Sequence, residues 1–445
     1  MKKKGFTLIE LLGVVIILGV LSLIAFPPLL NQIKNAKQGI KDSTKTLIID
    51  AAKDYYEDNT NNFDLIEGMT YCIDIKTLTD ENYLNKNLKN ENLNNIDTSK
   101  KVKLIYHNEK FNYDVVDSCQ NNSLTRNNIE VPIVTEDSGL YKSTTDHDRF
   151  IYRGGNSINN WIELNEGTEE TPNYVKYRII SFENDGTIKV IRDENIGRYS
   201  WDKAGNRTPD NGNTYCDATG CNVWGNQDDT LYNGEPLGDI FHYSYYSNMI
   251  LTNSSSGTVS NISTLNAFLN SMTNDSTVSW QSAINLDKYI VNHKFNVGGV
   301  YYEYNSDTYG DKGLQTEKKE ESLFTWEGKI GLPSITEFVE SSTNPNCTSI
   351  YSNYGGNPNH DGWPCSIDNY NYKTYSYNQW SINALSSRKN QVWVFNGSRG
   401  NFGQWDNTNN NYGVRPAFYL NPSLSLIGEG SEANPYRIVG ELWKK

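Results

Sequence analysis

An uncharged N-terminal segment constrains the fold of this chain more than any other feature. Lys2–Lys4 and Glu10 are the only charged residues before Lys34, and Leu11–Ile33 carries none. A run of this length is sufficient to cross a bilayer as one helix. The basic flank is expected to stay in the cytoplasm, which places the chain after Lys34 outside. A secretory signal peptide is disfavoured because no small-residue cleavage site follows the apolar core, whereas a plain signal anchor remains an alternative.

Glu10 distinguishes a plain anchor from a processed one. A carboxylate near the start of an apolar span costs a few kcal/mol on insertion scales, so Glu10 is a functional candidate; snorkelling to the interface is the alternative. The surrounding string Gly5-Phe6-Thr7-Leu8-Ile9-Glu10-Leu11-Leu12 resembles, in every position, the prepilin cleavage and methylation motif of type IV pilins and pseudopilins. The resemblance implies that a prepilin peptidase removes residues 1–5 by cutting between Gly5 and Phe6, and that the new amino terminus on Phe6 is methylated.

The same resemblance implies assembly with other pilin subunits through residues 6–58. Glu10 lies four residues beyond the new terminus, and its carboxylate is expected to pair with the amino group of a neighbouring subunit, because opposite charges attract strongly in low dielectric. Pro27 lies where many pilins carry a helix-breaking proline. Pro28 removes a further backbone donor, so a bend or local melting is expected there.

Apolar residues at helical spacing extend this helix beyond the uncharged segment to about Asp58. At roughly 1.5 Å per residue, a helix from Phe6 to Asp58 is on the order of 80 Å long. Its outer half is expected to pack on a domain, and its inner half on other subunits. The apolar positions are Ile33, Ile40, Leu47, Ile48, Ala51, Ala52 and Tyr55.

Residues 59–120 are sufficient only for a small antiparallel sheet packed on that helix. Met69–Ile75 is predicted as one strand, and Lys101–Tyr106 with Phe111–Val116 as a hairpin. The unit resembles a minimal globular domain of a pilin or pseudopilin. Residues 121–137 are polar, contain a single proline and are predicted to be a linker.

Six cysteines occur as three neighbouring pairs along the sequence, which indicates disulfides formed outside the cytoplasm. Nearest-neighbour pairing is one of several connectivities that the sequence leaves open. Metal ligation is the weaker alternative, because no two cysteines have the Cys-x2-Cys spacing. The pairs are Cys72 with Cys119, Cys216 with Cys221, and Cys347 with Cys365.

Residues 138–445 are predicted as a large β-rich domain, which makes the fold class α+β. The whole chain contains 30 Tyr and 34 Gly, a composition typical of short aromatic strands joined by turns. Tyr174–Phe182 and Thr187–Arg192, separated by Asn184-Asp185-Gly186, predict a hairpin. The chain of 445 residues exceeds one domain, so two or three units are expected.

Three short helices are predicted within the large domain. Ser263–Met272 and Trp280–His293 have helical character without strand alternation. Ser334, followed three residues later by Glu337, has the capping-box signature of a third helix.

The C-terminal part ends in three strand-like pieces, Trp380–Leu385, Gln391–Phe395 and Tyr412–Leu420. Over roughly residues 326–439 they resemble the closing sheet of C-type-lectin-like domains, including the formylglycine-generating-enzyme and sulfatase-modifying group, where a terminal Gly-x-Arg strand is typical. Those enzymes need a reactive cysteine pair near that strand. No cysteine follows Cys365 here, so their activity is not expected.

The sequence favours binding over catalysis for the large domain. No His-Glu-x-x-His, Gly-x-Ser-x-Gly or P-loop motif occurs, and the chain is predicted not to be an enzyme. The five histidines are scattered, and each is more typical of a surface or hydrogen-bonded residue than of a catalyst. They are His107, His147, His242, His293 and His360.

Trp393, Trp405 and Asp406, with Asn407–Asn411, are the candidate ligand-binding residues. Aromatic rings beside Asp and Asn suit recognition of a sugar or Ca²⁺, and no other cofactor or metal is expected. The alternative is that the tryptophans belong to the core and the asparagines form turns. A fold resemblance alone cannot supply a ligand.

These observations predict a type IV pilin-like minor subunit that is anchored in the cell membrane, with its N-terminus cytoplasmic, and then assembled into an extracellular filament. The large domain would be an adhesin-like module for a glycan or surface protein. A pseudopilin with a structural or priming role in secretion or DNA uptake is the alternative. Forty basic against 53 acidic residues give a net charge of −13, so direct nucleic-acid binding is not expected.

Overall fold

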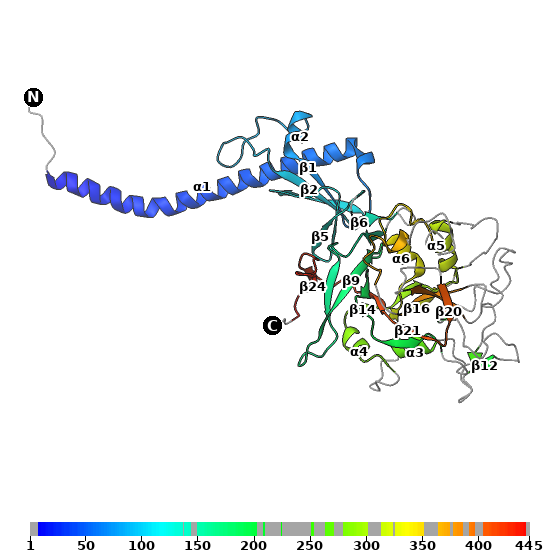
Figure 1. The fold of residues 1–445 in the computed structure, drawn as a ribbon. Helices are drawn as coiled ribbons and strands as arrows, with labels where there is room; N and C mark the ends of the chain where they lie inside the picture. Colours follow the sequence, from blue (N-terminus) through cyan, green and yellow to red (C-terminus); the bar gives the residue numbers. More distant parts are fainter. Residues whose placement is uncertain are drawn as a thin grey trace, which may run out of the picture. The chain divides into compact units, whose positions relative to one another are not determined.

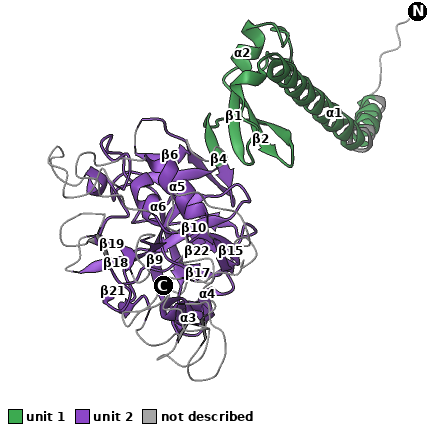
Figure 2. Ribbon diagram, turned by 90° about the vertical axis from the view of Figure 1, so that its right-hand side faces the viewer, with its two compact units in different colours: residues 1–124 green, residues 125–445 purple. Residues whose placement is uncertain are grey.

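A computed structural model of the chain divides into two compact units, residues 1–124 and 125–445 (Figure 2). The division falls after Leu124, inside the segment predicted to be a linker. The structure describes residues 8–136, 138–143, 149–202, 208–209, 224, 251–252, 263–270, 279–300, 313–323, 325–350, 364–373, 377–385, 391–396 and 404–441.

The first unit is built on one long helix, α1 (Leu8–Asp58), which confirms the predicted end at Asp58. Figure 1 shows α1 as a continuous, curved ribbon that projects away from the rest of its unit. Pro27 and Pro28 lie inside it without interrupting the helical backbone. The expected local melting is therefore not observed, and the helix accommodates its prolines by curving.

A small sheet packs on the second half of α1. It contains β1 (Met69–Asp74), β2 (Lys101–His107) and β3 (Lys110–Val116), in the order β3-β2-β1. The β2–β3 turn has Asn108 and Glu109 at φ of 51° and 61°, the left-handed backbone that a two-residue hairpin turn requires. The predicted strand and hairpin are confirmed. The short helix α2 (Ile75–Asp80) and a 3-10 turn at Thr60–Asn62 complete the described elements of this unit before β4.

The segment expected to be a linker instead forms β4 (Ser123–Arg126) and β5 (Ile129–Pro132). Met69 and Thr70 of β1 pair with Leu124 and Ser123. Asn127 and Asn128, at φ of 50° and 65°, form the tight turn between the two strands. The linker prediction failed because two asparagines at a hairpin turn have the same composition as a flexible connection.

This turn lies close to the start of the second unit, at Thr125, and is hydrogen-bonded to the C-terminal part of the chain. The Asn127 amide nitrogen donates to the carbonyls of Pro422 (3.1 Å) and Leu424 (2.7 Å). In return, the Leu426 N–H donates to the Asn127 carbonyl over 2.7 Å. The first and last parts of unit 2 are thus joined directly.

The core of unit 2 is an eight-stranded sheet in which the predicted hairpin is confirmed as β9 and β10. Ile179, Phe182, Val190 and Phe418 are fully buried, because strands covered on both faces need apolar residues on both. The order is β14 (Ile290–Val291), β22 (Ala417–Leu420), β10 (Ile188–Arg192), β9 (Tyr174–Phe182), β7 (Phe150–Arg153) and β6 (Gly139–Lys142), with β17 (Ile330–Gly331) paired to β22 and β8 (Trp161–Asn165) paired to β9.

A second sheet contains the other C-terminal strands and corrects one prediction. The segment Tyr412–Leu420 was expected to form a single strand, but it divides between the two sheets at Val414–Pro416, since Pro416 has no N–H for a ladder. The second sheet runs β11 (Arg198–Ser200), β21 (Asn411–Gly413), β18 (Asn378–Ala384), β19 (Gln391–Asn396) and β20 (Gln404–Asn407).

Shorter elements surround the two sheets. The helices are α3 (Thr264–Asn270), α4 (Ser282–Leu286), α5 (Leu314–Ser322) and α6 (Ile335–Glu340), with a 3-10 turn at Pro364–Ser366. The two-stranded pairs are β12 (Thr208–Pro209) with β13 (Leu251–Thr252), β15 (His293–Asn296) with β16 (Thr325–Gly328), and β23 (Leu426–Ile427) with β24 (Arg437–Ile438).

The three predicted helices have different outcomes. The first is confirmed as α3. The second, Trp280–His293, is helical only at α4 and then continues into β14, where Ile290 and Val291 pair with Leu420 and Tyr419. The capping box is confirmed at α6, where the Ser334 hydroxyl accepts from the Glu337 N–H and the Glu337 carboxylate accepts from the Ser334 N–H.

Two of the three predicted disulfides are present, Cys72–Cys119 in unit 1 and Cys347–Cys365 in unit 2. The second lies in an apolar cluster with Phe338, Trp393 and Phe395. Cys216 and Cys221 lie outside the described residues. The nearest-neighbour pairing is thus confirmed for the pairs that the structure describes.

Membrane crossing is not confirmed. Of the helices within the described residues, none is both long enough and apolar enough to count as a membrane span.

Candidate functional site

The first half of α1 presents apolar side chains that nothing in the described structure covers. Leu8 is 86% exposed, Ile9 77% and Ile33 46%. In the second half, by contrast, Ile48 and Ala52 are buried against the small sheet. The remaining exposed apolar residues of the first half are Leu11, Leu12, Val14, Val15, Ile16, Ile17, Leu18, Val20, Leu29 and Leu30.

The exposed apolar positions follow one another in sequence, so they surround the helix instead of forming one stripe. A helix that is apolar all round is stable only when other apolar groups surround it. Apart from the nearby backbone of α1 and the adjoining residues, no atom of the described structure lies within 4 Å of the place that a Cβ would occupy at Gly13 or Gly19. Small residues on an apolar helix allow a second backbone to approach closely. The first half of α1 is therefore suited to packing among other helices.

The second half of α1 is held to its unit by specific polar contacts. Lys45 forms an ion pair of 2.6 Å with Asp114 of β3. The Thr44 hydroxyl donates to the carbonyl of Lys89 over 3.1 Å. An edge-to-face contact joins Tyr55 to Tyr83, with ring centroids 5.3 Å apart. These contacts divide α1 into a supported half and an unsupported half.

Of the residues predicted to act in processing and assembly, Glu10, Pro27 and Pro28 fall within α1. Gly5 and Phe6 precede the described residues. Glu10 lies in the first turns of α1, although its side chain is outside the described structure. Pro27 and Pro28 are both exposed within the helix.

The structure places the predicted ligand-binding residues in different surroundings. Trp393 is fully buried, and its indole N–H donates to the Val300 carbonyl over 3.1 Å. In this conformation a ligand at the surface cannot contact Trp393. The residue lies in the core, as the alternative interpretation of the sequence expected. Trp405 pairs with Trp393 in the β19–β20 register, but its side chain is outside the described structure.

Asp406 holds the turn between β20 and β21. Its carboxylate accepts from the N–H of Asn407 and the amide of Asn410, each over 2.7 Å, and from the hydroxyl of Tyr412. Burial, followed by the hydrogen bond to Asp406, raises the pKa of Tyr412 to about 12. With three donors already bound, Asp406 has little capacity left for an external ligand. No group of three metal-ligating side chains is found within the described residues.

The two described histidines are both engaged locally. His107 pairs with Glu67. The His293 ring stacks on Tyr419 at 3.6 Å between centroids, and its Nε2 lies 3.0 Å from the Asp185 carboxylate. The remaining three, His147, His242 and His360, lie outside the described residues.

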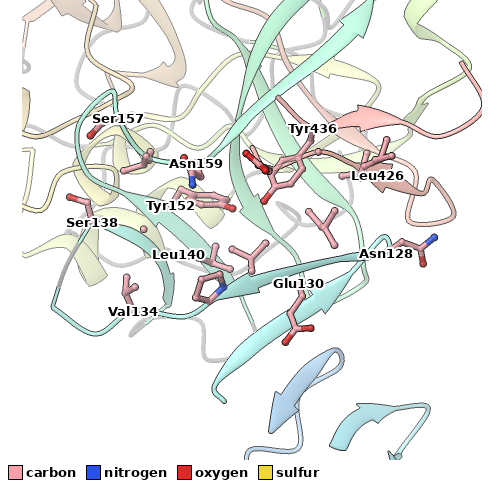
Figure 3. A pocket seen from close by; sticks show the side chains of 18 residues that line it. Asn128, Glu130, Val134, Ser138, Leu140, Tyr152, Ser157, Asn159, Leu426 and Tyr436 are labelled. Carbon is pink, nitrogen blue, oxygen red and sulfur yellow. The ribbon is translucent and has the colours of Figure 1, made fainter. Parts of the chain in front are cut away.

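A cavity of about 710 Å³ opens in unit 2 beside β5, β6 and the C-terminal segment (Figure 3). Tyr152 and Tyr436 are buried at its wall, and burial raises the pKa of both hydroxyls. Glu130 points away from the two tyrosines in Figure 3. The described lining consists of apolar groups, hydroxyls, amides and two carboxylates, which can bind a ligand passively but pair no nucleophile with a base.

A buried ion network, formed by Arg149, Glu183, Lys189, Glu337 and Glu340, was not predicted from the sequence. Arg149 contacts the three carboxylates at 3.0 Å (Glu183), 3.3 Å (Glu337) and 3.5 Å (Glu340), and Lys189 pairs with Glu337. Burial acts to lower the pKa of Arg149, but the three glutamates raise it well above its ordinary value. The only sequence signal was Glu337, identified as a capping residue.

Glu321 of α5 lies beside this network as a buried carboxylate that accepts from the N–H of Thr336 over 3.0 Å and from its hydroxyl. Burial raises the pKa of Glu321 to about 7, although the Thr336 hydrogen bonds lower it. A raised carboxyl pKa means that the folded state favours the protonated form. Stability should therefore be lost as the pH rises from about 4.5 to 7, by about 3 kcal/mol in total.

Replacing Glu321 by glutamine should remove this dependence, because the amide is neutral at every pH. The difference in unfolding free energy between Glu321→Gln and the original chain should grow as the pH rises from 5 to 8, as measured by urea unfolding. Glu327→Gln, an exposed change on β16, is the matched control. Its difference in unfolding free energy from the original chain should be the same at every pH. Parallel pH profiles for Glu321→Gln and the original chain would contradict the raised pKa.

Comparison with known proteins identifies the N-terminus only. A family model described as the prokaryotic N-terminal methylation motif matches residues 1–26. The matched segment contains Gly5, Phe6 and Glu10 and extends into the exposed half of α1. No curated protein and no solved structure matches the chain. The resemblance of residues 326–439 to C-type-lectin-like domains therefore finds no support.

Proposed function

We propose that this chain, whose N-terminus is that of a type IV pilin-like prepilin, is a minor pilus subunit that presents unit 2 as a non-enzymatic, adhesin-like module. Two observations together carry the proposal. The methylation motif matches residues 1–26, and the first half of α1 is apolar and uncovered in the described structure. Processing would place the new amino terminus at the start of that half. Assembly with other subunits would cover it.

Before assembly, the same segment would hold the chain in the cell membrane with Lys2–Lys4 on the cytoplasmic side. After cleavage by the prepilin peptidase, the helix would transfer from lipid to a bundle of equivalent helices. Lipid and a helix bundle both keep an apolar surface away from water, so the transfer requires no refolding of α1. Unit 2 would then lie outside the cell.

A minor role is favoured by size. Unit 2 spans residues 125–445, and unit 1 spans residues 1–124. A shaft built from repeated copies of α1 would have to accommodate an added domain larger than the pilin core at every repeat. A subunit present at few positions avoids this crowding.

Quantitative mass spectrometry of filaments from the native host tests the proposal. The mature chain should begin at a methylated Phe6, and its copy number should be a small minority of the pilin subunits. An N-terminus that remains at Met1 in cells with an active prepilin peptidase would overturn the processing step. A filament made mostly of this chain would overturn the minor role, and absence from filaments despite processing would favour a pseudopilin with a structural or priming role.

A further inference from the structure

A second cavity of unit 2, of about 870 Å³, has the size of a ligand site and a lining that is mostly charged and polar. We call it the charged cavity. It lies between strands β10 and β22 of the central sheet, β15, and the helices α5 and α6. Its lining includes part of the buried ion network, namely Arg149, Glu183, Lys189 and Glu337.

The inner wall of the charged cavity is costly to build. Arg149, Lys189 and Glu337 are 9%, 4% and 5% exposed. Replacing a buried ion pair by well-packed apolar residues of similar volume often leaves the stability of a core unchanged or increases it. Buried charges with shifted pKa values that face a cavity are more typical of binding sites than of plain cores. The wall is also held rigidly, because Glu337 is fixed by the capping box of α6.

The charges of this wall nearly balance one another; Glu321, which also lines the cavity, is a further carboxylate, and burial raises its pKa to about 7. Arg149, Lys189 and Lys318 face Glu183, Glu337 and Glu340, and Lys318 pairs with Glu340 over 2.6 Å. The wall therefore offers fixed dipoles and hydrogen-bonding groups without a large net field.

The rim has a different character. Lys294 of β15 and Lys319 of α5 are exposed, line the cavity, and form no ion pair within the part of the chain that the structure describes. Asn296 and Gln315 lie beside them and are also exposed. Lys294 has Glu327 as its cross-strand neighbour, but neither lysine is held in an ion pair in the described structure, so both remain able to attract an anion. The two amides supply both donors and acceptors.

The lining favours a saccharide over a peptide. A peptide ligand generally needs apolar pockets for its side chains. The aromatic rings that line the cavity offer little apolar surface. Phe295 and Tyr419 are only 1% and 6% exposed, and the half-buried His293 ring is stacked on Tyr419 with its Nε2 beside the Asp185 carboxylate. The accessible groups are lysines, amides and hydroxyls, which match a ligand rich in hydroxyl groups that carries a negative charge.

From this arrangement we infer that the charged cavity binds an acidic saccharide, with its carboxylate at Lys294 and Lys319 and its hydroxyls toward the inner wall. The inference deepens the proposed function, on which it rests, by giving a ligand class to the exposed module. It also moves the expected site away from Trp393 and Asp406, whose hydrogen-bonding groups are already used.

The test is calorimetric binding of the purified full chain in detergent to paired probes. The probes are a galacturonic acid trimer with its methyl ester, and sialyllactose with lactose. At least one acidic probe should bind about tenfold more tightly than its uncharged partner, because a hydrogen bond to a charged group contributes about 1.5–3 kcal/mol. Higher salt should reduce this preference. Failure of both acidic probes to bind, or equal binding of each pair, would overturn the inference.

Lys294→Ala combined with Lys319→Ala should weaken the acidic probe about tenfold and leave the uncharged partner unchanged. Lys176→Ala combined with Lys288→Ala is the matched control. It removes the same charge from two lysines that do not line the cavity, the half-buried Lys176 and the exposed Lys288, which pair with Glu432 and Glu441. Equal loss in both double variants would show general attraction and contradict a site. Filament incorporation of the rim variant, measured in parallel, separates failure of this inference from failure of the proposed function.

Discussion

Glu10→Gln should reduce incorporation of the chain into filaments by about tenfold or more while leaving its level in the membrane unchanged. Insertion is not impaired, since removing a charge from an apolar span makes insertion easier. Assembly should suffer, because a neutral amide can accept a hydrogen bond but cannot form the charge pair expected with the amino group of the neighbouring Phe6. Breaking a charge pair in low dielectric costs on the order of 3–5 kcal/mol, and about 1.4 kcal/mol already corresponds to a factor of ten. The measurement is the ratio of filament-bound to membrane-bound chain on quantitative immunoblots.

Glu57→Gln is the matched control for this experiment. Glu57 is an exposed residue near the other end of α1, in the half that packs on the sheet. The same chemical change there should leave the ratio unaltered. If Glu10→Gln enters filaments as efficiently as Glu57→Gln, the pairing of Glu10 with the amino terminus is refuted.

Arg149→Met should lower the unfolding free energy of unit 2 by about 3–5 kcal/mol, because it leaves buried carboxylates without their shared cation. Lys189 and Lys318 remain to compensate Glu337 and Glu340, but Glu183 loses its contact at 3.0 Å. Arg149→Lys should give an intermediate loss, since an ammonium restores the charge without the planar fork that contacts three glutamates at once. Urea unfolding of the full chain, followed by tryptophan fluorescence, measures both effects.

Arg437→Met provides the comparison, because Arg437 also pairs with a glutamate but from a more exposed position. Its distance to Glu163 is 3.1 Å, and its side chain is 37% exposed. Exposed pairs contribute about 0–1 kcal/mol. A loss for Arg149→Met no larger than that for Arg437→Met would show that water screens the network far more than its burial indicates.

Local patterns predicted the parts of the fold that depend on neighbours in sequence. The helix end at Asp58, the hairpin Tyr174–Phe182 with its partner strand, and the cap at Ser334 each follow from spacing over a few residues. The strands β4 and β5 were missed because a turn of two asparagines has the composition of a linker, and only pairing with β1 distinguishes them.

The candidate sites were harder to predict, because their groups meet over long sequence separations. Arg149 and Glu337 are 188 positions apart, and a charged residue in a single sequence is normally assigned to the surface. Trp393 shows the opposite case. A tryptophan beside Asn and Gly left both a binding loop and the core open from the sequence, and its strand places the ring in the apolar cluster with Phe338. In both cases burial decided the role, and burial depends on the tertiary fold.

If unit 2 is carried on a filament, as proposed, the bonds between Asn127 and the residues Pro422, Leu424 and Leu426 have a mechanical consequence. Tension transmitted from the N-terminal helix enters unit 2 at its first residues. Because the turn at Asn127 is bonded to Pro422, Leu424 and Leu426, the load would pass directly to this C-terminal segment. Unravelling beyond β4 would require these hydrogen bonds to break. The same contacts that close the fold thus protect the module against being pulled open by its own anchor.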